Sequence, residues 1–202
     1  MGRDEFLLMV GFLQGLMVGL ALLLAWGLRI NPWEYWSLEP RAWVYGVLCA
    51  LPLCLLGWWL SRSTVSWARS VRALMVHYLG PSLAACHWFD LLLVALLVGI
   101  TEELLFRGVL QVWLMQWNVH AAVIVTGIIF GTLHSASWSY MLLTSLAGCY
   151  LGATMLLWSP PNLLIPMLAH AATDLCSFLL VRRSYLAEQQ AGAGVDTTPE
   201  AD

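Results

Sequence analysis

Long apolar stretches set the strongest limit on how this chain can fold. The chain is 60% hydrophobic and only 10% charged, whereas soluble domains carry about 25% charged residues. Its mean hydropathy is +0.77. As a helix, the first stretch, residues 6–28, measures about 34 Å, which is enough to cross a bilayer. It is too long for the apolar core of a signal peptide, so we expect it to stay attached.

We predict an all-α fold, a polytopic membrane helical bundle with about six transmembrane helices. The predicted spans are residues 6–28, 43–60, 89–117, 119–138, 140–158 and 163–181. Tryptophans near the ends of these stretches are typical of an aromatic belt at the membrane surface. The less apolar residues 61–88 are broken by Gly80-Pro81, and we expect this segment to lie partly at the interface.

The chain divides into three expected parts. Residues 1–88 hold two N-terminal transmembrane helices and the interfacial segment. Residues 89–186 form a four-helix core. Residues 187–202 are rich in glycine, alanine, threonine and acids, a composition that predicts a disordered acidic tail.

The arginines predict how the spans are oriented, because positive charge collects on the cytoplasmic side of a membrane protein. With six spans and a cytoplasmic N-terminus, most arginines fall inside, and only Arg29 and Arg41 fall outside. The inside set is Arg3, Arg62, Arg69, Arg72, Arg182 and Arg183. We therefore expect both termini in the cytoplasm. The compact chain without a transit peptide favours a prokaryotic cytoplasmic membrane, and no basic patch supports nucleic-acid binding.

Glycine spacing predicts where helices approach one another closely. Gly11, Gly15 and Gly19 recur every four residues on the first span, and Gly148 and Gly152 form a second pair on the fifth. Small residues at this spacing let the backbones of two membrane helices come together. Scattered glycines without a packing role remain an alternative for the first span.

Ionisable side chains interrupt the third predicted span at residues 101–108. Charges at membrane depth are costly and usually face a protein interior or a water-filled cavity. In a helix, Glu103 and Arg107 lie one turn apart on the same face and can form an ion pair. Glu102 points about 100° away, lacks that partner, and is a candidate general base. The alternative is an ion pair beside a second acid that only bridges helices.

Two further polar pairs occur in the fourth and sixth spans. Phe130 and His134 lie one turn apart, as do His170 and Asp174. Counted along their helices, Glu102 and His134 both lie about 22 Å from the outer ends of their spans, Asp174 about 18 Å and His170 about 12 Å. We therefore expect all four ionisable residues to converge near mid-membrane. Each histidine alone could simply tie two helices together, but the whole group favours catalysis or metal binding.

Three motifs in this order resemble those of the CAAX protease and bacteriocin-processing family. The motifs are Glu102-Glu103-x-x-x-Arg107, Phe130-x-x-x-His134 and His170-x-x-x-Asp174. This family is also called the Abi family, or the type II CAAX prenyl endopeptidases. The likeness covers about residues 91–183, while the first two spans match nothing that we can name. It implies an intramembrane glutamic-type endopeptidase that needs no metal or other cofactor, with residues 89–186 as the catalytic core.

The resemblance also implies a role for each matched residue. Glu102 is the base and His134 its partner, and together they activate a water molecule. His170 and Asp174 form the oxyanion side. The implied supporting residues are the ion pair Glu103 and Arg107, and Phe130, which packs the cavity wall. Eukaryotic relatives commonly have Asn at the position of Asp174. An ionised Asp cannot donate a hydrogen bond to an oxyanion, so Asp174 is either protonated or orients His170.

Two other functions stay open at the level of the sequence. One is a zinc metalloprotease with Zn²⁺ held by His134, His170 and a carboxylate, although no His-Glu-x-x-His motif is present. The other is a non-proteolytic membrane scaffold or immunity protein that binds a peptide or a sensor partner. The family resemblance favours the metal-free protease. It implies a peptide or protein substrate that enters from the lipid bilayer, such as a precursor peptide or a membrane-anchored protein.

Overall fold

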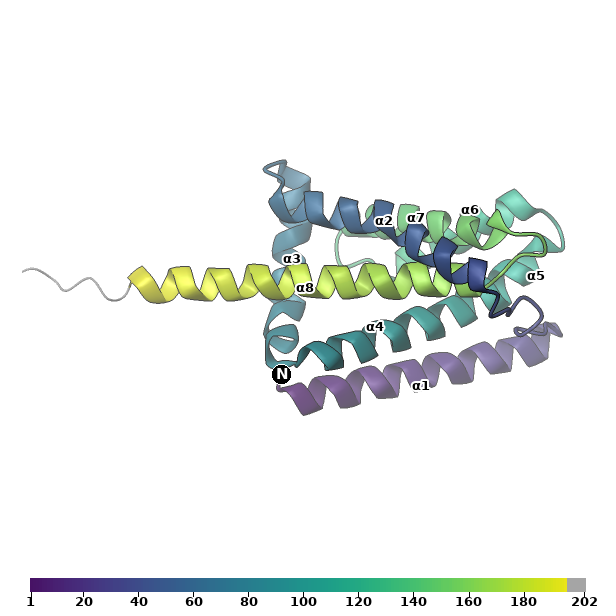
Figure 1. Cartoon of the computed structure of the whole chain (residues 1–202), viewed down its shortest axis with the longest axis horizontal. Coiled ribbons are helices and arrows are strands. Elements are labelled where there is room, and N and C mark those ends of the chain that lie inside the picture. The colour runs from purple at the N-terminus through teal and green to yellow at the C-terminus, as the bar shows by residue number, and fades with distance from the viewer. Residues whose placement is uncertain (196–202) are drawn as a thin grey trace, which may run out of the picture.

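The computed structural model describes residues 1–195, and within this range all regular secondary structure is helical (Figure 1). The predicted all-α fold is therefore confirmed. The elements are α1 (Arg3–Leu28), α2 (Pro40–Arg62), α3 (Ser66–Ala85), α4 (Trp88–Glu103), η1 (Leu104–Gln111), α5 (Val112–Met115), α6 (Val119–Leu133), α7 (Trp138–Thr154), η2 (Met155–Leu157) and α8 (Leu164–Val195).

Within residues 1–195, four helical segments are long and apolar enough to cross a membrane. They are Arg3–Leu28, Pro40–Arg62, Trp138–Leu157 and Leu164–Ala191, and Val119–Leu133 is a shorter apolar helix. In addition, α4, η1 and α5 follow one another without a gap from Trp88 to Met115. These lengths and compositions identify a helical bundle of a membrane protein. The number of six spans stays a prediction.

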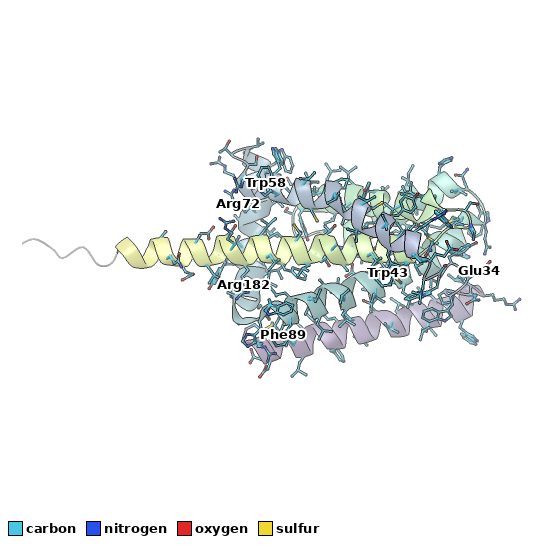
Figure 2. All side chains as sticks on the ribbon, viewed as in Figure 1. Glu34, Trp43, Trp58, Arg72, Phe89 and Arg182 are labelled. Carbon is cyan, nitrogen blue, oxygen red and sulfur yellow. The ribbon has the colours of Figure 1, made fainter. Side chains whose placement is uncertain are left out.

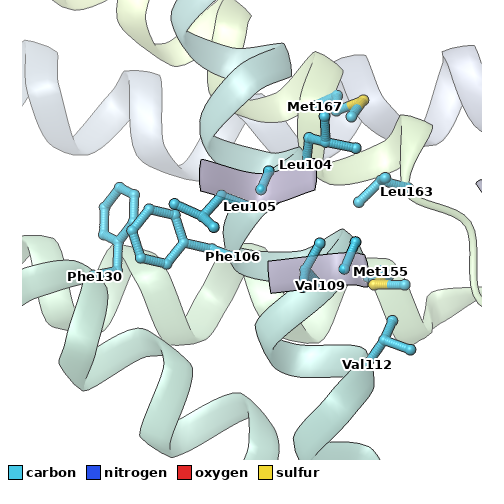
Figure 3. Packing of buried hydrophobic residues seen from close by; sticks show 11 residues of the cluster. Leu104, Leu105, Phe106, Val109, Val112, Phe130, Met155, Leu163 and Met167 are labelled. Carbon is cyan, nitrogen blue, oxygen red and sulfur yellow. The ribbon is translucent and has the colours of Figure 1, made fainter. Parts of the chain in front are cut away.

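The long helix α8 is the element around which the bundle packs. It contacts α2, α3 and α4 along its length, and Figure 1 shows it running between α2 and α4. A core of buried apolar side chains surrounds η1. It includes Leu104, Phe106 and Val109 from η1, Phe130 from α6 and Met167 from α8 (Figure 3). This core packs around the segment that directly follows the two glutamates.

Helices α1 and α4 run in the same direction, side by side (Figure 1). Arg3, at the start of α1, donates from Nε and Nη2 to the two carboxylate oxygens of Asp90, both at 2.7 Å. Asp90 also accepts the backbone N–H of His87 at 2.8 Å and so caps the first turn of α4. This bidentate ion pair fixes the relative height of the two helices.

The helix α3 crosses the end of the bundle, roughly perpendicular to α8 in Figure 1. Figure 2 shows Arg72 and Arg182 at this end and Glu34 and Trp43 at the opposite end. The interfacial position of this segment stays a prediction.

Some helix boundaries differ from those that the sequence predicts. Helix α6 ends at Leu133 rather than continuing to residue 138, and α8 continues through Val195. Residues 187–195 belong to the predicted disordered tail but continue α8. The alanine, glutamine and glutamate of residues 187–191 are good helix formers and favour this extension. The rest of the expected tail, residues 196–202, lies outside the described residues.

The two glycine patterns have different outcomes. At Gly11, Gly15 and Gly19, a side-chain carbon would meet no atom of the described residues within 4 Å, so no helix within this range uses that face for close packing. At Gly148, a side-chain carbon would lie 3.0 Å from the Cα of Gly127. The second pattern therefore does bring α7 against α6 at backbone distance.

Candidate active site

A π-helix begins directly after the two adjacent glutamates. The segment η1 covers Leu104–Gln111, and its wider turn changes which side chains face the neighbouring helices. π-Helical turns inside α-helices are rare and frequently occur at functional sites. Nothing in the residue spacing of this stretch predicted it.

Side chains of η1 are anchored to the backbone of α7. Arg107 donates from Nη2 to the carbonyl oxygen of Gly148 at 2.6 Å, and Gln111 donates from Nε2 to that of Gly152 at 2.9 Å. Gly152 leaves room for this amide, because an added Cβ would lie 2.5 Å from Gln111 Oε1. The two anchors hold η1 firmly against α7.

Glu103 is shared by two partners. Its Oε1 accepts a hydrogen bond from Arg107 Nη1 at 2.9 Å and lies 2.8 Å from His170 Nδ1. Glu103 and Arg107 are completely buried. The ion pair predicted from the sequence is therefore present, but the bond from Glu103 to α8 was not predicted. Glu103 is the residue that orients the ring of His170.

The opposite ring nitrogen of His170 faces the other two carboxylates. His170 Nε2 lies 3.9 Å from Glu102 Oε2 and 3.6 Å from Asp174 Oδ2. Among the described residues, Glu102 Oε2 is buried without any hydrogen-bond partner. The structure thus brings Glu102, His170 and Asp174 together, and it leaves one carboxylate oxygen of Glu102 without a protein donor.

His134 caps the C-terminal end of α6, one residue beyond Leu133. Its Nδ1 lies 2.8 Å from the carbonyl oxygen of Phe130, and its ring stacks on Phe130 with centroids 4.5 Å apart. Phe130 also packs edge-to-face against His170 at 5.8 Å and lies under the guanidinium of Arg107 at 5.0 Å. Phe130 is therefore the apolar wall that separates the buried ion pair from His134.

A cavity of about 420 Å³ opens beside these residues, and Glu102, His134, His170 and Asp174 all line it. Along α8 the lining continues from His170 to Ser184, a length of about 21 Å on one helix face. Most of the remaining wall is apolar, and Arg72 from α3 lies in the lining as well. The four predicted residues therefore share one elongated, largely apolar cavity.

A close contact between α4 and α8 sets the spacing of the site. A Cβ added at Gly99 would lie 2.7 Å from the backbone nitrogen of Ala171 and 2.9 Å from its Cβ. Ala171 follows His170, and Gly99 lies one turn before Glu102. Only glycine permits this approach, which brings the acids of α4 within reach of the imidazole of α8.

The sequence predicted the ionisable residues of the site but not several of its neutral polar residues. Tyr140 and Thr173 line the same cavity, and Gln111 anchors η1. Gln111 carried a usable signal, since a polar side chain in an apolar span usually faces the protein interior. Tyr140 and Thr173 carried none, because both residue types are common at membrane interfaces and in membrane helices.

The model of the family described as "Type II CAAX prenyl endopeptidase Rce1-like" matches residues 84–176. This part of the chain is similar to that family. The match includes all three motifs, from Glu102 to Asp174, so the family resemblance predicted from the sequence is confirmed. We found no match to the chain among curated proteins or among solved structures.

The matched region contains α4, η1, α5, α6, α7, η2 and the first part of α8, whereas α1, α2 and nearly all of α3 precede it. Its family indicates a protease, an endopeptidase that acts within the membrane. Within the described residues, no group of three or more His, Cys, Asp or Glu side chains has the geometry of a metal site.

Proposed function

We propose that the chain is an intramembrane endopeptidase of the glutamic type. Glu102 is the general base, and His134 positions the attacking water with it. The single observation that carries this proposal is the buried Oε2 of Glu102, which has no hydrogen-bond partner among the described residues and lies in the wall of a cavity shared with two histidines. A carboxylate in this setting can accept a proton from a bound water.

In the proposed reaction, Glu102 both takes and returns the transferred proton. Glu102 takes a proton from water, and the resulting hydroxide attacks the carbonyl carbon of the scissile peptide. The tetrahedral oxygen receives a hydrogen bond from His170 Nε2, whose ring is held because Nδ1 bonds to Glu103 at 2.8 Å. On collapse of the intermediate, the C–N bond breaks and Glu102 returns its proton to the leaving amine. Such a preorganised donor is usually a large contributor to catalysis.

Asp174 has a narrower role in this proposal than the family resemblance implies. Its Oδ2 lies 3.6 Å from His170 Nε2, so it faces the same nitrogen as Glu102. An ionised Asp174 would favour the doubly protonated imidazole that the oxyanion requires, while it could not itself donate to that oxygen. We therefore propose that Asp174 keeps the ring of His170 doubly protonated.

We further propose a multi-pass protein with both termini in the cytoplasm. Arg72 and Arg182 lie at the same end of the bundle (Figure 2), and Arg3 pairs with Asp90 at the start of α4, beside the N-terminus. Positive charge at this end supports a cytoplasmic position by the usual charge bias. The substrate is a peptide or a membrane-anchored protein that reaches the cavity from the bilayer.

The test uses purified protein in detergent and internally quenched peptides, with and without a C-terminal farnesyl-cysteine. We expect Glu102→Gln to fold normally and to lose activity about 10²–10⁴-fold, the usual contribution of an acid–base group. His134→Ala should lose a comparable amount, and the double variant should be little worse, because residues that act as a unit are not additive. Glu34→Gln, the same change at the opposite end of the bundle, is the control.

Two outcomes of this test would contradict the proposal. Near-normal turnover by Glu102→Gln would favour the scaffold function or a different catalytic acid. Activity that disappears with chelators and returns with Zn²⁺, together with stoichiometric zinc in the purified protein, would favour a metalloprotease that uses His134 and His170. Activity that survives chelators in the wild-type protein supports the metal-free reaction.

A further inference from the structure

Gln14 is a buried amide in the middle of α1. It is 8% exposed, and the other buried residues of this helix are small or apolar, namely Phe6, Val10, Ala21 and Ala25. Its Oε1 accepts a hydrogen bond from the hydroxyl of Thr101, the residue directly before Glu102. A buried amide in a membrane helix is costly unless its polar atoms are hydrogen-bonded. The oxygen and the NH₂ group of this amide therefore both need a partner.

The contact between Gln14 and Thr101 belongs to a regular register. The pair Arg3–Asp90 and the pair Gln14–Thr101 both join residues 87 positions apart in the sequence. Because α1 and α4 run in the same direction, the ion pair at their start places Gln14 opposite Thr101 three turns later. The amide therefore sits beside Glu102 because of the packing of the whole helix pair.

The other end of the amide has no hydrogen-bond partner among the described residues. Within the part of the chain that the structure describes, the only hydrogen bond to the Gln14 side chain is the one from Thr101. Gln14 lines the same cavity as Glu102, His134 and His170, so its NH₂ group is the polar part that remains for a cavity ligand. A Leu or Met at this position would fill the space without leaving two donors unused.

We propose that Gln14 is a substrate-binding residue whose Nε2 donates a hydrogen bond to a backbone carbonyl oxygen of the peptide substrate. The proposal rests on the proposed function. It places part of the substrate site on α1, outside the matched residues 84–176. Thr101 is the positioning residue, because its hydroxyl, whose one proton is shared between the amide oxygen and the Leu97 carbonyl oxygen at 2.8 Å, leaves the amide donors for the cavity.

A peptide is the ligand that this donor fits. An extended peptide presents one carbonyl oxygen per residue, and each loses its water when it enters an apolar cavity. A neutral amide replaces that water without adding a charge beside Glu102 and Asp174. A carbonyl that flanks the scissile bond is bound equally in the ground state and the transition state, so the effect falls on KM and not on kcat.

The experiment measures KM and kcat for the best-cleaved member of the quenched peptide set. We expect Gln14→Met to raise KM about 5–10-fold, the equivalent of one net hydrogen bond, with kcat and the melting temperature in detergent unchanged. Thr101→Val should raise KM by a smaller factor, and Thr101→Ser, which restores the hydroxyl, should return KM toward the wild-type value. Gln116→Met makes the same chemical change on an exposed residue and is the control.

Several outcomes would overturn the proposal. An unchanged KM in Gln14→Met excludes a bond to the substrate, and a lower melting temperature with unchanged KM assigns Gln14 to helix packing alone. A fall in kcat at constant KM excludes ground-state binding. Binding of the same peptide to Glu102→Gln, with and without Gln14→Met, separates the two proposals, since it reports on Gln14 whether or not Glu102 is the base. If the wild-type protein neither cleaves nor binds any peptide of the set, both proposals are contradicted.

Discussion

Arg107 provides the sharpest test of how the site is held together. It is fully buried, donates to Glu103 at 2.9 Å and to the carbonyl oxygen of Gly148 at 2.6 Å. Arg107→Met keeps much of the volume of the side chain but leaves the Glu103 carboxylate with its bond to His170 alone. Removal of one member of a buried ion pair costs up to about 3–5 kcal/mol, and the bond to His170 places this case toward the lower end.

The double variant separates this charge effect from the loss of the other bond. Glu103→Gln with Arg107→Met removes both charges, and the Gln carbonyl can still accept from His170. The double variant should therefore recover most of the lost stability and keep only the cost of the unpaired Gly148 carbonyl, about 1–3 kcal/mol. The expected coupling between the two positions is at least about 2 kcal/mol, well above the additivity error of distant sites.

The measurement is a double-mutant cycle of unfolding free energies in mixed micelles, followed by tryptophan fluorescence. Arg62→Met is the matched control, because Arg62 is exposed and lies over the ring of Trp58, where it should contribute less than about 1 kcal/mol. The reasoning is refuted if Arg107→Met unfolds like the wild-type protein, or if the two single changes simply add.

Two further predictions concern packing and topology. Gly99→Ala should separate α4 from α8, since the new carbon would lie 2.7 Å from the Ala171 nitrogen. We expect the free energy of unfolding to fall by about 1–3 kcal/mol and peptide cleavage to fall with it. Gly11→Ala, where no described atom lies within 4 Å, is the control and should be neutral; equal effects at both positions would disprove the close-contact argument. Reporter fusions after Arg72 and after Arg183 should both report the cytoplasm, and a signal from the other side at either place would exclude six spans with internal termini.

The amino-acid sequence determined the class of the molecule and the identity of the groups in its site. Apolar stretches long enough to cross a bilayer leave little alternative to a helical bundle, and the three motifs identified the family. The convergence of Glu102, His170 and Asp174 followed from depth along the helices, because the rise per residue of a helix is fixed. These properties depend on one segment at a time, and for that reason the sequence alone could supply them.

Only the tertiary structure decided how those groups are used. Three features depend on neighbouring helices. They are the π-helix after Glu103, the end of α6 just before His134, and the contact of Glu103 with both Arg107 and His170. The same is true of Gln14, which reaches Thr101 only because Arg3 and Asp90 set the register of α1 against α4. Side-chain partners across helices are fixed by packing at distances of a few ångströms, and the pattern of a single helix does not contain that information.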